Sequence, residues 1–113
     1  MANPSKAKGT AFETAVVDYL RSHGQPHAER RALSGGKDKG DVTGVPGAMI
    51  ECKNEKTVTL GAYADEVKVQ TANAGASLGV AVVKRRNRGP GDAYVLMSLS
   101  QFVEMIADDE VAK

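Results

Sequence analysis

A predicted β-hairpin centred on Pro46 constrains the fold of this chain more than any other feature. Residues 41–43 and 48–52 are short strand-like runs, and the Gly- and Pro-rich turn between them is typical of a hairpin. If the turn is symmetric about Pro46, Asp41 lies opposite Glu51. Directly opposed residues share one face of a sheet, with Cβ atoms ~5 Å apart. The sequence therefore predicts that two carboxylates lie side by side.

The alternation of side chains along the second strand adds a lysine to this pair. Glu51 and Lys53 are two residues apart and share a face, whereas Ile50 and Cys52 point to the other face. Two neighbouring carboxylates repel each other unless a cation lies between them. A hard divalent metal bound by Asp41 and Glu51, with Lys53 facing an anionic substrate, explains this pattern economically. The alternative is an ordinary surface ion pair between Glu51 and Lys53.

A second Glu-x-Lys pattern in the chain serves as a comparison. Glu66 and Lys68 have the same spacing, but they fall in a predicted helix, where residues two apart do not face each other. No Gly-turn hairpin brings an aspartate to that pair. The pattern at Glu51 is therefore the one that predicts a site.

The order of these residues resembles the core motif of the PD-(D/E)xK nuclease superfamily. Residues 40–41, Gly-Asp, stand where the motif has Pro-Asp, and residues 51–53 supply its Glu-x-Lys. Two further segments point to one group within this superfamily. They are residues 8–13, which open the first predicted helix, and residues 30–36, which precede the aspartate. Their order is similar to that of archaeal-type Holliday-junction resolvases and their phage relatives. The resemblance covers about residues 6–106.

The predicted metal ligands are oxygen atoms, which Mg²⁺ prefers and for which Mn²⁺ can substitute. Asp41, Glu51 and the backbone carbonyl of Cys52 are the first of these. The resemblance assigns Glu13, in the first helix, to the same metal shell through a water molecule. The alternative for Glu13 is a glutamate in the first turn that interacts favourably with the helix dipole.

Three further residues are expected to act in the site. Lys53 is expected to remain protonated beside two carboxylates and to orient the attacking water or stabilise charge on the phosphate. By resemblance, Gln70 reaches into the site, and the alternative is a half-buried amide bonded to the backbone. Ser34, followed by two glycines, resembles the resolvase serine that contacts the scissile backbone, and the alternative is a flexible turn.

Two clusters of basic residues are candidates for DNA contact, because Lys and Arg bind phosphate regardless of base sequence. For the second cluster, the alternative is solvated loop charge. The first cluster flanks Ser34 and the second follows a predicted buried strand; together they comprise Arg30, Arg31, Lys37, Lys39, Lys84, Arg85, Arg86 and Arg88.

The 113 residues predict one domain with a loose lead-in at residues 1–8 and an acidic tail at 108–113. The net charge of +1 does not by itself indicate a nucleic-acid partner, so the prediction of DNA binding depends on the two local clusters of Lys and Arg. A lone cysteine and the lack of a membrane-length apolar run predict a cytoplasmic protein with no membrane partner. The compact size and the Ala-, Gly- and Arg-rich composition suggest a bacterium or phage-infected cell as its source.

The hydrophobic pattern predicts the element order αβββαββα, a mixed central β-sheet flanked by helices. Such an α/β core is the restriction-endonuclease-like fold that the resemblance implies. The predicted helices span residues 9–22, 61–76 and 98 or 100 to 107, and the predicted strands outside the hairpin span 27–33, 79–84 and 93–97. Ser98 and Gln101 have the spacing of a capping box at the start of the last helix.

These observations predict a Mg²⁺-dependent, structure-selective endodeoxyribonuclease, similar to a Holliday-junction resolvase, that leaves a 5′-phosphate and a 3′-hydroxyl. Symmetric cutting of a four-way junction needs two active sites, so a homodimer is expected, with the last strand and helix as candidates for the interface. One alternative is a nickase or restriction-like nuclease that acts on duplex or single-stranded ends. Another is a DNA-binding module of the same fold that does not cut.

Overall fold

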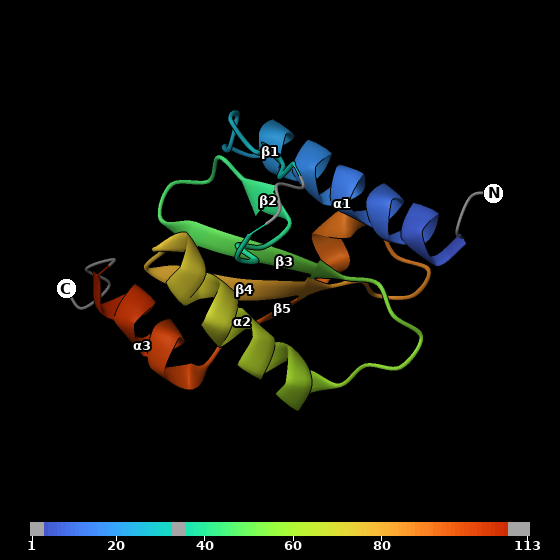
Figure 1. The fold of residues 1–113 in the computed structure, drawn as a ribbon. Coiled ribbons are helices and arrows are strands. Elements are labelled where there is room, and N and C mark those ends of the chain that lie inside the picture. The colour runs from blue at the N-terminus through green and yellow to red at the C-terminus, as the bar shows by residue number, and fades with distance from the viewer. Residues whose placement is uncertain (1–3, 33–35, 109–113) are drawn as a thin grey trace.

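In the computed structural model, which describes residues 4–32 and 36–108, helices pack around a five-stranded sheet (Figure 1). The elements follow the predicted order, with one 3₁₀ turn added before the last strand. They are α1 (Pro4–Ser22), β1 (Glu29–Arg30), β2 (Val42–Thr43), β3 (Ala48–Lys53), α2 (Leu60–Ala74), β4 (Leu78–Val83), η1 (Pro90–Asp92), β5 (Tyr94–Leu96) and α3 (Leu99–Asp108).

The sheet is mixed, and its strands lie in chain order from β1 to β5. Strands β3 and β4 run parallel, whereas the other neighbouring pairs are antiparallel. Because parallel strands cannot be joined by a tight turn, α2 forms the crossover between β3 and β4. The prediction of an α/β fold with a mixed sheet flanked by helices is confirmed at this level.

The hairpin has the predicted register. Val42 pairs with Ile50, and the Asp41 backbone N–H donates to the Ile50 carbonyl over 2.8 Å. The regular pairing ends at Val42, since this bond is one residue out of register, and the Asp41 side chain is instead bound to β3 by the Cys52 backbone N–H. A one-residue slip would have sent the two carboxylates to opposite faces.

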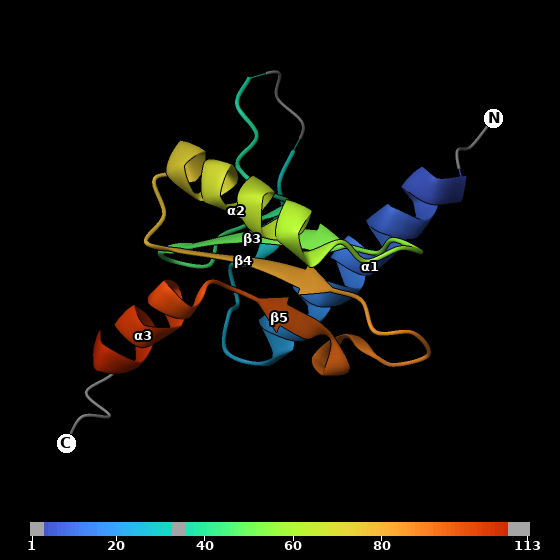
Figure 2. The same cartoon turned by 90° about the horizontal axis from the view of Figure 1, so that it is seen from below.

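Helices α1 and α2 cover opposite faces of the sheet, as Figure 2 shows with the strands seen almost edge-on. On the α1 face, Val17 packs with Val42 and Ile50. On the α2 face, Tyr63 packs with Met49. Since side chains alternate along β3, Glu51 and Lys53 belong to the α2 face together with Met49.

Helix α1 begins at Pro4, five residues earlier than predicted, so residues 4–8 are helical and not a loose lead-in. Proline is favourable in the first turn of a helix, where its missing N–H leaves no bond unmade. Gly9 lies inside the helix, where a glycine is tolerated. This correction puts Glu13 in the third turn of α1, too far from the helix start for the proposed dipole interaction.

The other element ends differ from prediction by smaller amounts. The strand predicted at 27–33 is only two residues long, and Ser34 lies outside the described residues, as does the tail from residue 109 onward. Helix α2 ends at Ala74 because Gly75 adopts the left-handed conformation, with φ of 64°. At the start of α3, the Gln101 backbone N–H donates to Ser98 Oγ over 3.2 Å, which confirms half of the capping box. Among the described helices, none is long and apolar enough to cross a membrane.

Gly44 is expected to tolerate no side chain. Its φ of +86° is strained for other residues, and an added Cβ would overlap the carbonyl oxygen of His27. We expect Gly44→Ala to lower the free energy of unfolding by roughly 3 kcal/mol, the sum of backbone strain and overlap. Gly24→Ala is the matched control, because Gly24 has φ of +98° but open space around it. Urea unfolding measures both variants, and equal losses would contradict the overlap.

Candidate functional site

The hairpin brings the Asp41 carboxylate beside that of Glu51, which belongs to the α2 face. The Cys52 backbone N–H donates to Asp41 Oδ2 over 2.8 Å and fixes that carboxylate against β3. The Glu51 residue is only 7% exposed. Burial, the charge of Asp41 and a hydrogen bond with Asp41 raise the pKa of Glu51 to about 8. Without a cation, this pair therefore holds a proton near neutral pH.

Lys53 lies beside Glu51 and is held from two sides. Its Nζ is 3.4 Å from Glu51 Oε2 and 2.6 Å from Glu66 Oε1, and it lies 5.2 Å from the centre of the Tyr63 ring. Burial acts to lower the pKa of Lys53, but the Glu66 and Glu51 carboxylates outweigh it and the pKa is raised. Lys53 is therefore an ammonium ion, suited to stabilise negative charge and not to abstract a proton.

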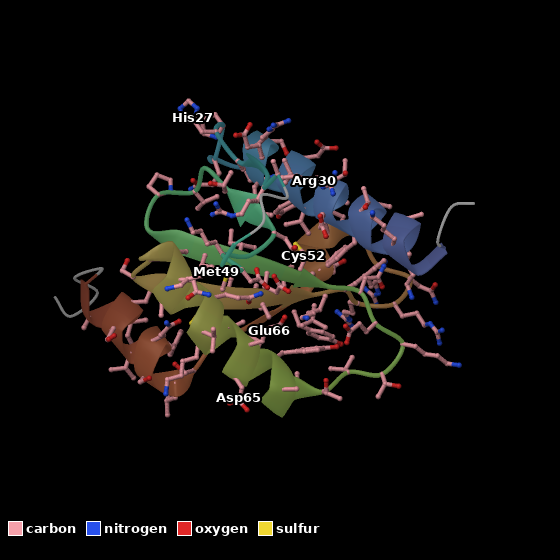
Figure 3. All side chains as sticks on the ribbon, viewed as in Figure 1. His27, Arg30, Met49, Cys52, Asp65 and Glu66 are labelled. Carbon is pink, nitrogen blue, oxygen red and sulfur yellow. The ribbon has the colours of Figure 1, made fainter. Side chains whose placement is uncertain are left out.

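Glu66 is a site residue that the sequence analysis missed when it compared the two Glu-x-Lys patterns. The helix predicted around it is confirmed, and Glu66 does not pair with Lys68, but its side chain reaches Lys53 on the neighbouring strand. In Figure 3, Glu66 lies toward the sheet and its neighbour Asp65 lies away from it. A signal was present: Glu66 falls three residues after Tyr63 and four before Gln70, both on the buried side of α2.

Gln70 is buried as expected, but its partner is an acidic side chain. Its residue is 1% exposed, and Nε2 donates to Asp38 Oδ2 over 2.8 Å. The alternative of a half-buried amide bonded to the backbone is therefore wrong. Gln70 Oε1 is buried and has no hydrogen-bond partner among the described residues.

Asp38 is a second residue that the sequence analysis missed. Besides Gln70, it binds the Gly40 backbone N–H through Oδ1 at 2.9 Å, and its carbonyl accepts from Asn73 Nδ2 at 2.9 Å. The Gly40 N–H and the Gln70 amide lower the pKa of Asp38. Through these bonds Asp38 ties α2 to the segment that leads into Asp41.

Glu13 approaches the sheet from the opposite helix. Its Oε1 lies 3.1 Å from Arg30 Nε. Burial raises the pKa of the Cys52 thiol, and the charges of Asp41 and Glu13 raise it further. The Cys52 side chain packs against the core on the α1 face, so only its backbone carbonyl remains as a predicted metal ligand.

A groove of about 510 Å³ separates α1 from the segment that carries Asp41. Glu13 and Asp41 line it, and Arg31 has a buried Nε without a hydrogen-bond partner among the described residues. The basic residues that line this groove are Lys6, Arg30, Arg31, Lys37 and Lys39. The first predicted cluster thus surrounds two of the candidate acids.

The second basic cluster lies on the other side of the start of α1 and is only partly assembled. Lys84 and Arg88 line a hollow of about 360 Å³ together with Lys8 of α1. Arg85 instead lies over the Tyr94 ring, 5.6 Å from its centre, and Arg86 is exposed. The first turns of α1 therefore connect the groove, which Lys6 lines, to this hollow.

The carboxylate oxygens of Asp41 and Glu51 suit a hard divalent ion, but the protein side chains supply few ligands. Asp41 and Glu51 supply two carboxylates that repel each other, and such a pair favours a bound cation. Across residues 4–32 and 36–108, however, no three His, Cys, Asp or Glu side chains form a group that could hold a metal. Mg²⁺ keeps several waters, so water and the Cys52 carbonyl would complete its shell.

Comparison of the chain with protein-family models, with curated proteins and with solved structures finds no match. A function for this chain has to be inferred from its own residues and their geometry.

Proposed function

We propose that this chain is a Mg²⁺-dependent, structure-selective endodeoxyribonuclease of the PD-(D/E)xK type, similar to a Holliday-junction resolvase, with a restriction-endonuclease-like fold. The observation that carries the proposal is the pairing of the Asp41 and Glu51 carboxylates, with protonated Lys53 beside Glu51. A surface ion pair would not require the buried Glu51 to lie beside a second, partly buried acid. An arrangement of this kind suits phosphodiester chemistry.

In the proposed reaction, a bound Mg²⁺ or Mn²⁺ supplies an acidified water as the nucleophile. Asp41, Glu51 and the Cys52 carbonyl would hold the ion. The water oxygen would bond to phosphorus as the bond from phosphorus to the 3′ oxygen breaks; the water would lose one proton to solvent, and the 3′ oxygen would take one from solvent, which gives a 5′-phosphate and a 3′-hydroxyl. Lys53 stabilises the negative charge that develops on the phosphate.

Glu66 has a positioning role in this scheme. It binds Lys53 more closely than Glu51 does, at 2.6 Å against 3.4 Å. Lys53 therefore remains charged and in place when Glu51 binds a metal ion.

The charged surface around the carboxylates supports DNA as the substrate. The groove and the hollow beside α1 present Lys and Arg side chains from distant parts of the chain. Such contacts bind the phosphate backbone and position a helix without reading its sequence. Selectivity would then come from the shape of the DNA.

The substrate can be tested with two DNAs of equal sequence, a four-way junction and a linear duplex, each incubated with Mg²⁺. We expect paired, symmetric cuts in the junction by a homodimer. Equal cutting of the duplex would favour the nickase or restriction-like alternative. Binding to both DNAs without cleavage would favour the non-cleaving module.

The groove and the hollow on either side of α1 are expected to contribute separately to DNA affinity. Replacing Lys84 and Arg88 with Gln removes two positive charges from the hollow. We expect weaker binding and a salt dependence, log K against log salt, that is shallower by about 1.8, since each phosphate contact contributes roughly 0.9.

Lys68→Gln is the matched control for this experiment. Lys68 is exposed and lines a different hollow, between α2 and the segment that leads into α3. Fluorescence anisotropy across a salt series measures all variants. An unchanged slope in the double variant would exclude the hollow from the DNA interface.

A further inference from the structure

The segment that leads into Asp41 is fastened to α2 through one acidic residue, Asp38. Its Oδ2 accepts from Gln70 Nε2 over 2.8 Å, and its backbone carbonyl accepts from Asn73 Nδ2 over 2.9 Å. Glu66, one turn before Gln70, binds Lys53 from the same helix. Helix α2 therefore holds both the lysine of the candidate site and the segment that carries its aspartate.

Asp38 also fixes the backbone of the residue directly before Asp41. Its Oδ1 accepts the Gly40 N–H over 2.9 Å, which forms a turn closed by an aspartate side chain. Gly40 has φ of +94°, and an added Cβ would overlap the Met49 sulfur. The direction in which the chain enters Asp41 is therefore set at Gly40, by a bond that Asp38 accepts.

Asp41 receives its other constraints from the sheet and from the strand before it. Its backbone N–H donates to the Ile50 carbonyl, and its carbonyl accepts the Arg31 N–H, both over 2.8 Å. Its Oδ2 accepts the Cys52 N–H, also over 2.8 Å, and its carboxylate lies beside Glu51. The bonds of Asp38 add α2 to the elements that hold this carboxylate in place.

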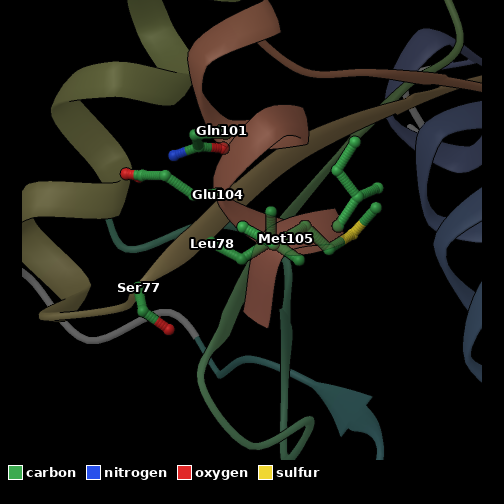
Figure 4. A pocket seen from close by; sticks show the side chains of 7 residues that line it. Ser77, Leu78, Gln101, Glu104 and Met105 are labelled. Atoms are coloured by element: carbon green, nitrogen blue, oxygen red, sulfur yellow. The ribbon is translucent and has the colours of Figure 1, made fainter. Parts of the chain in front are cut away.

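The charge of Asp38 sets the orientation of the Gln70 amide. The Gly40 N–H and the Gln70 amide lower the pKa of Asp38, and an ionised carboxylate can only accept hydrogen bonds. Gln70 therefore presents its NH₂ group, and its buried Oε1 has no partner among the described residues. Gln101, which lines the hollow of about 890 Å³ under α3 in Figure 4, has the other orientation, because its Oε1 accepts the Gly79 N–H.

We propose that Asp38 is a positioning residue for Asp41. By closing the turn at Gly40 and joining it to α2, Asp38 holds the Asp41 carboxylate beside Glu51. This geometric role is independent of any metal. The expected consequence, a higher affinity for a divalent ion, rests on the proposed function.

Amide hydrogen exchange followed by NMR, without metal or DNA, tests the geometric role. The reporter is the Cys52 N–H, because it donates to the Asp41 carboxylate. We expect Asp38→Ala to speed its exchange by ~5-fold or more, about the loss of one hydrogen bond. Asp38→Asn keeps an oxygen that can accept the Gly40 N–H, so it should keep the slow exchange. Asp65→Ala is the matched control, because Asp65 is exposed on the outer side of α2 (Figure 3).

Mn²⁺ binding, measured by isothermal titration calorimetry without DNA, tests the consequence for the metal. Residues that orient metal ligands typically contribute 10–100-fold to metal affinity, so we expect a loss of about that size in Asp38→Ala. Asp38→Asn should bind nearly as well as the wild type. A wild type that binds no Mn²⁺ would contradict the proposed function, and Cys52 exchange would still decide the positioning role.

Three results would overturn the proposal. The first is an unchanged rate of Cys52 exchange in Asp38→Ala. The second is an equal increase for the amides of β4, which would show a general loss of stability; we expect none, because Asp38 is exposed and lies outside both hydrophobic clusters. The third is an equal loss of Mn²⁺ affinity in Asp38→Ala and Asp38→Asn, because Asp38 would then act through its charge and not through the turn.

Discussion

Glu51→Gln is expected to reduce Mg²⁺-dependent cleavage of a four-way junction by at least ~10³-fold, the effect of losing a group that acts on a metal-activated water. Glutamine is nearly the same size and leaves the hairpin unchanged. It cannot carry the negative charge that would hold a divalent ion opposite Asp41. Rates are measured under single-turnover conditions, so that product release does not mask the chemical step.

Two further variants show whether the loss of cleavage in Glu51→Gln is specific to the carboxylate pair. Asp65→Asn removes a carboxylate from the same part of the chain, but Asp65 lies on the outer side of α2 and should leave the rate unchanged (Figure 3). Asp41→Asn should match Glu51→Gln, since both remove half of one pair. Junction binding without Mg²⁺ should persist in all three variants. Cleavage by Glu51→Gln at the wild-type rate would contradict the proposed function.

The part of the site that lies in the hairpin was predictable from the sequence. Turn chemistry and strand alternation act over short distances, and together they fix which residues face each other. The register between Val42 and Ile50 came from the position of Pro46 alone, and it is the register that the structure shows. The separation of Glu51 from Cys52, onto opposite faces of β3, follows from the same alternation.

The rest of the site depends on how α2 crosses β3, which no local pattern specifies. Helical periodicity put Gln70 on the buried side of α2 and placed Glu66 beside it, but it did not say which strand residue each would meet. Lys53 proved to be the partner of Glu66. Asp38 lies in a loop without periodicity, so its bonds to Gln70 and Gly40 had no sequence signal.

The last helix shows the same division between local and long-range information. Ser98 was predicted as a cap, and it does accept the Gln101 N–H. The Gln101 side chain does not complete the capping box but accepts the Gly79 N–H from β4, at 3.1 Å. The apolar side of α3 is exposed because α3 lies at the end of the sheet. The amphipathic pattern alone does not reveal this placement.

Stability in the absence of metal is expected to fall as the pH rises from 5 to 9. The pKa of Glu51 is raised from 4.5 to about 8 in the folded chain, because burial and Asp41 disfavour its charge. Between these values the folded state binds a proton that the unfolded state has lost. The stabilisation is complete below the unfolded pKa and is lost as pH rises through the folded pKa, with a slope of up to ~1.4 kcal/mol per pH unit.

Asp38 and Lys53 act outside this window, and Cys52, whose pKa is raised from 9.0, adds to the fall only at its alkaline end. The pKa of Asp38 is lowered from 3.8, so its contribution is lost only as the solution becomes more acidic than that. The pKa of Lys53 is raised from 10.5, so its contribution is lost only in more alkaline solution. The slope between pH 5 and 8 therefore reports mainly on Glu51.

Mg²⁺ and Glu51→Gln should each flatten this slope, and for different reasons. A bound divalent ion replaces the shared proton and stabilises the charged pair, so added Mg²⁺ should stabilise the wild type most at pH 9. Glutamine has no proton to lose, so Glu51→Gln should keep its stability at high pH and gain little from Mg²⁺. Urea unfolding at several pH values, with and without Mg²⁺, measures both effects without any DNA. A wild type whose stability at pH 9 does not respond to Mg²⁺ would show that the pair binds no metal, whatever the cleavage assay finds.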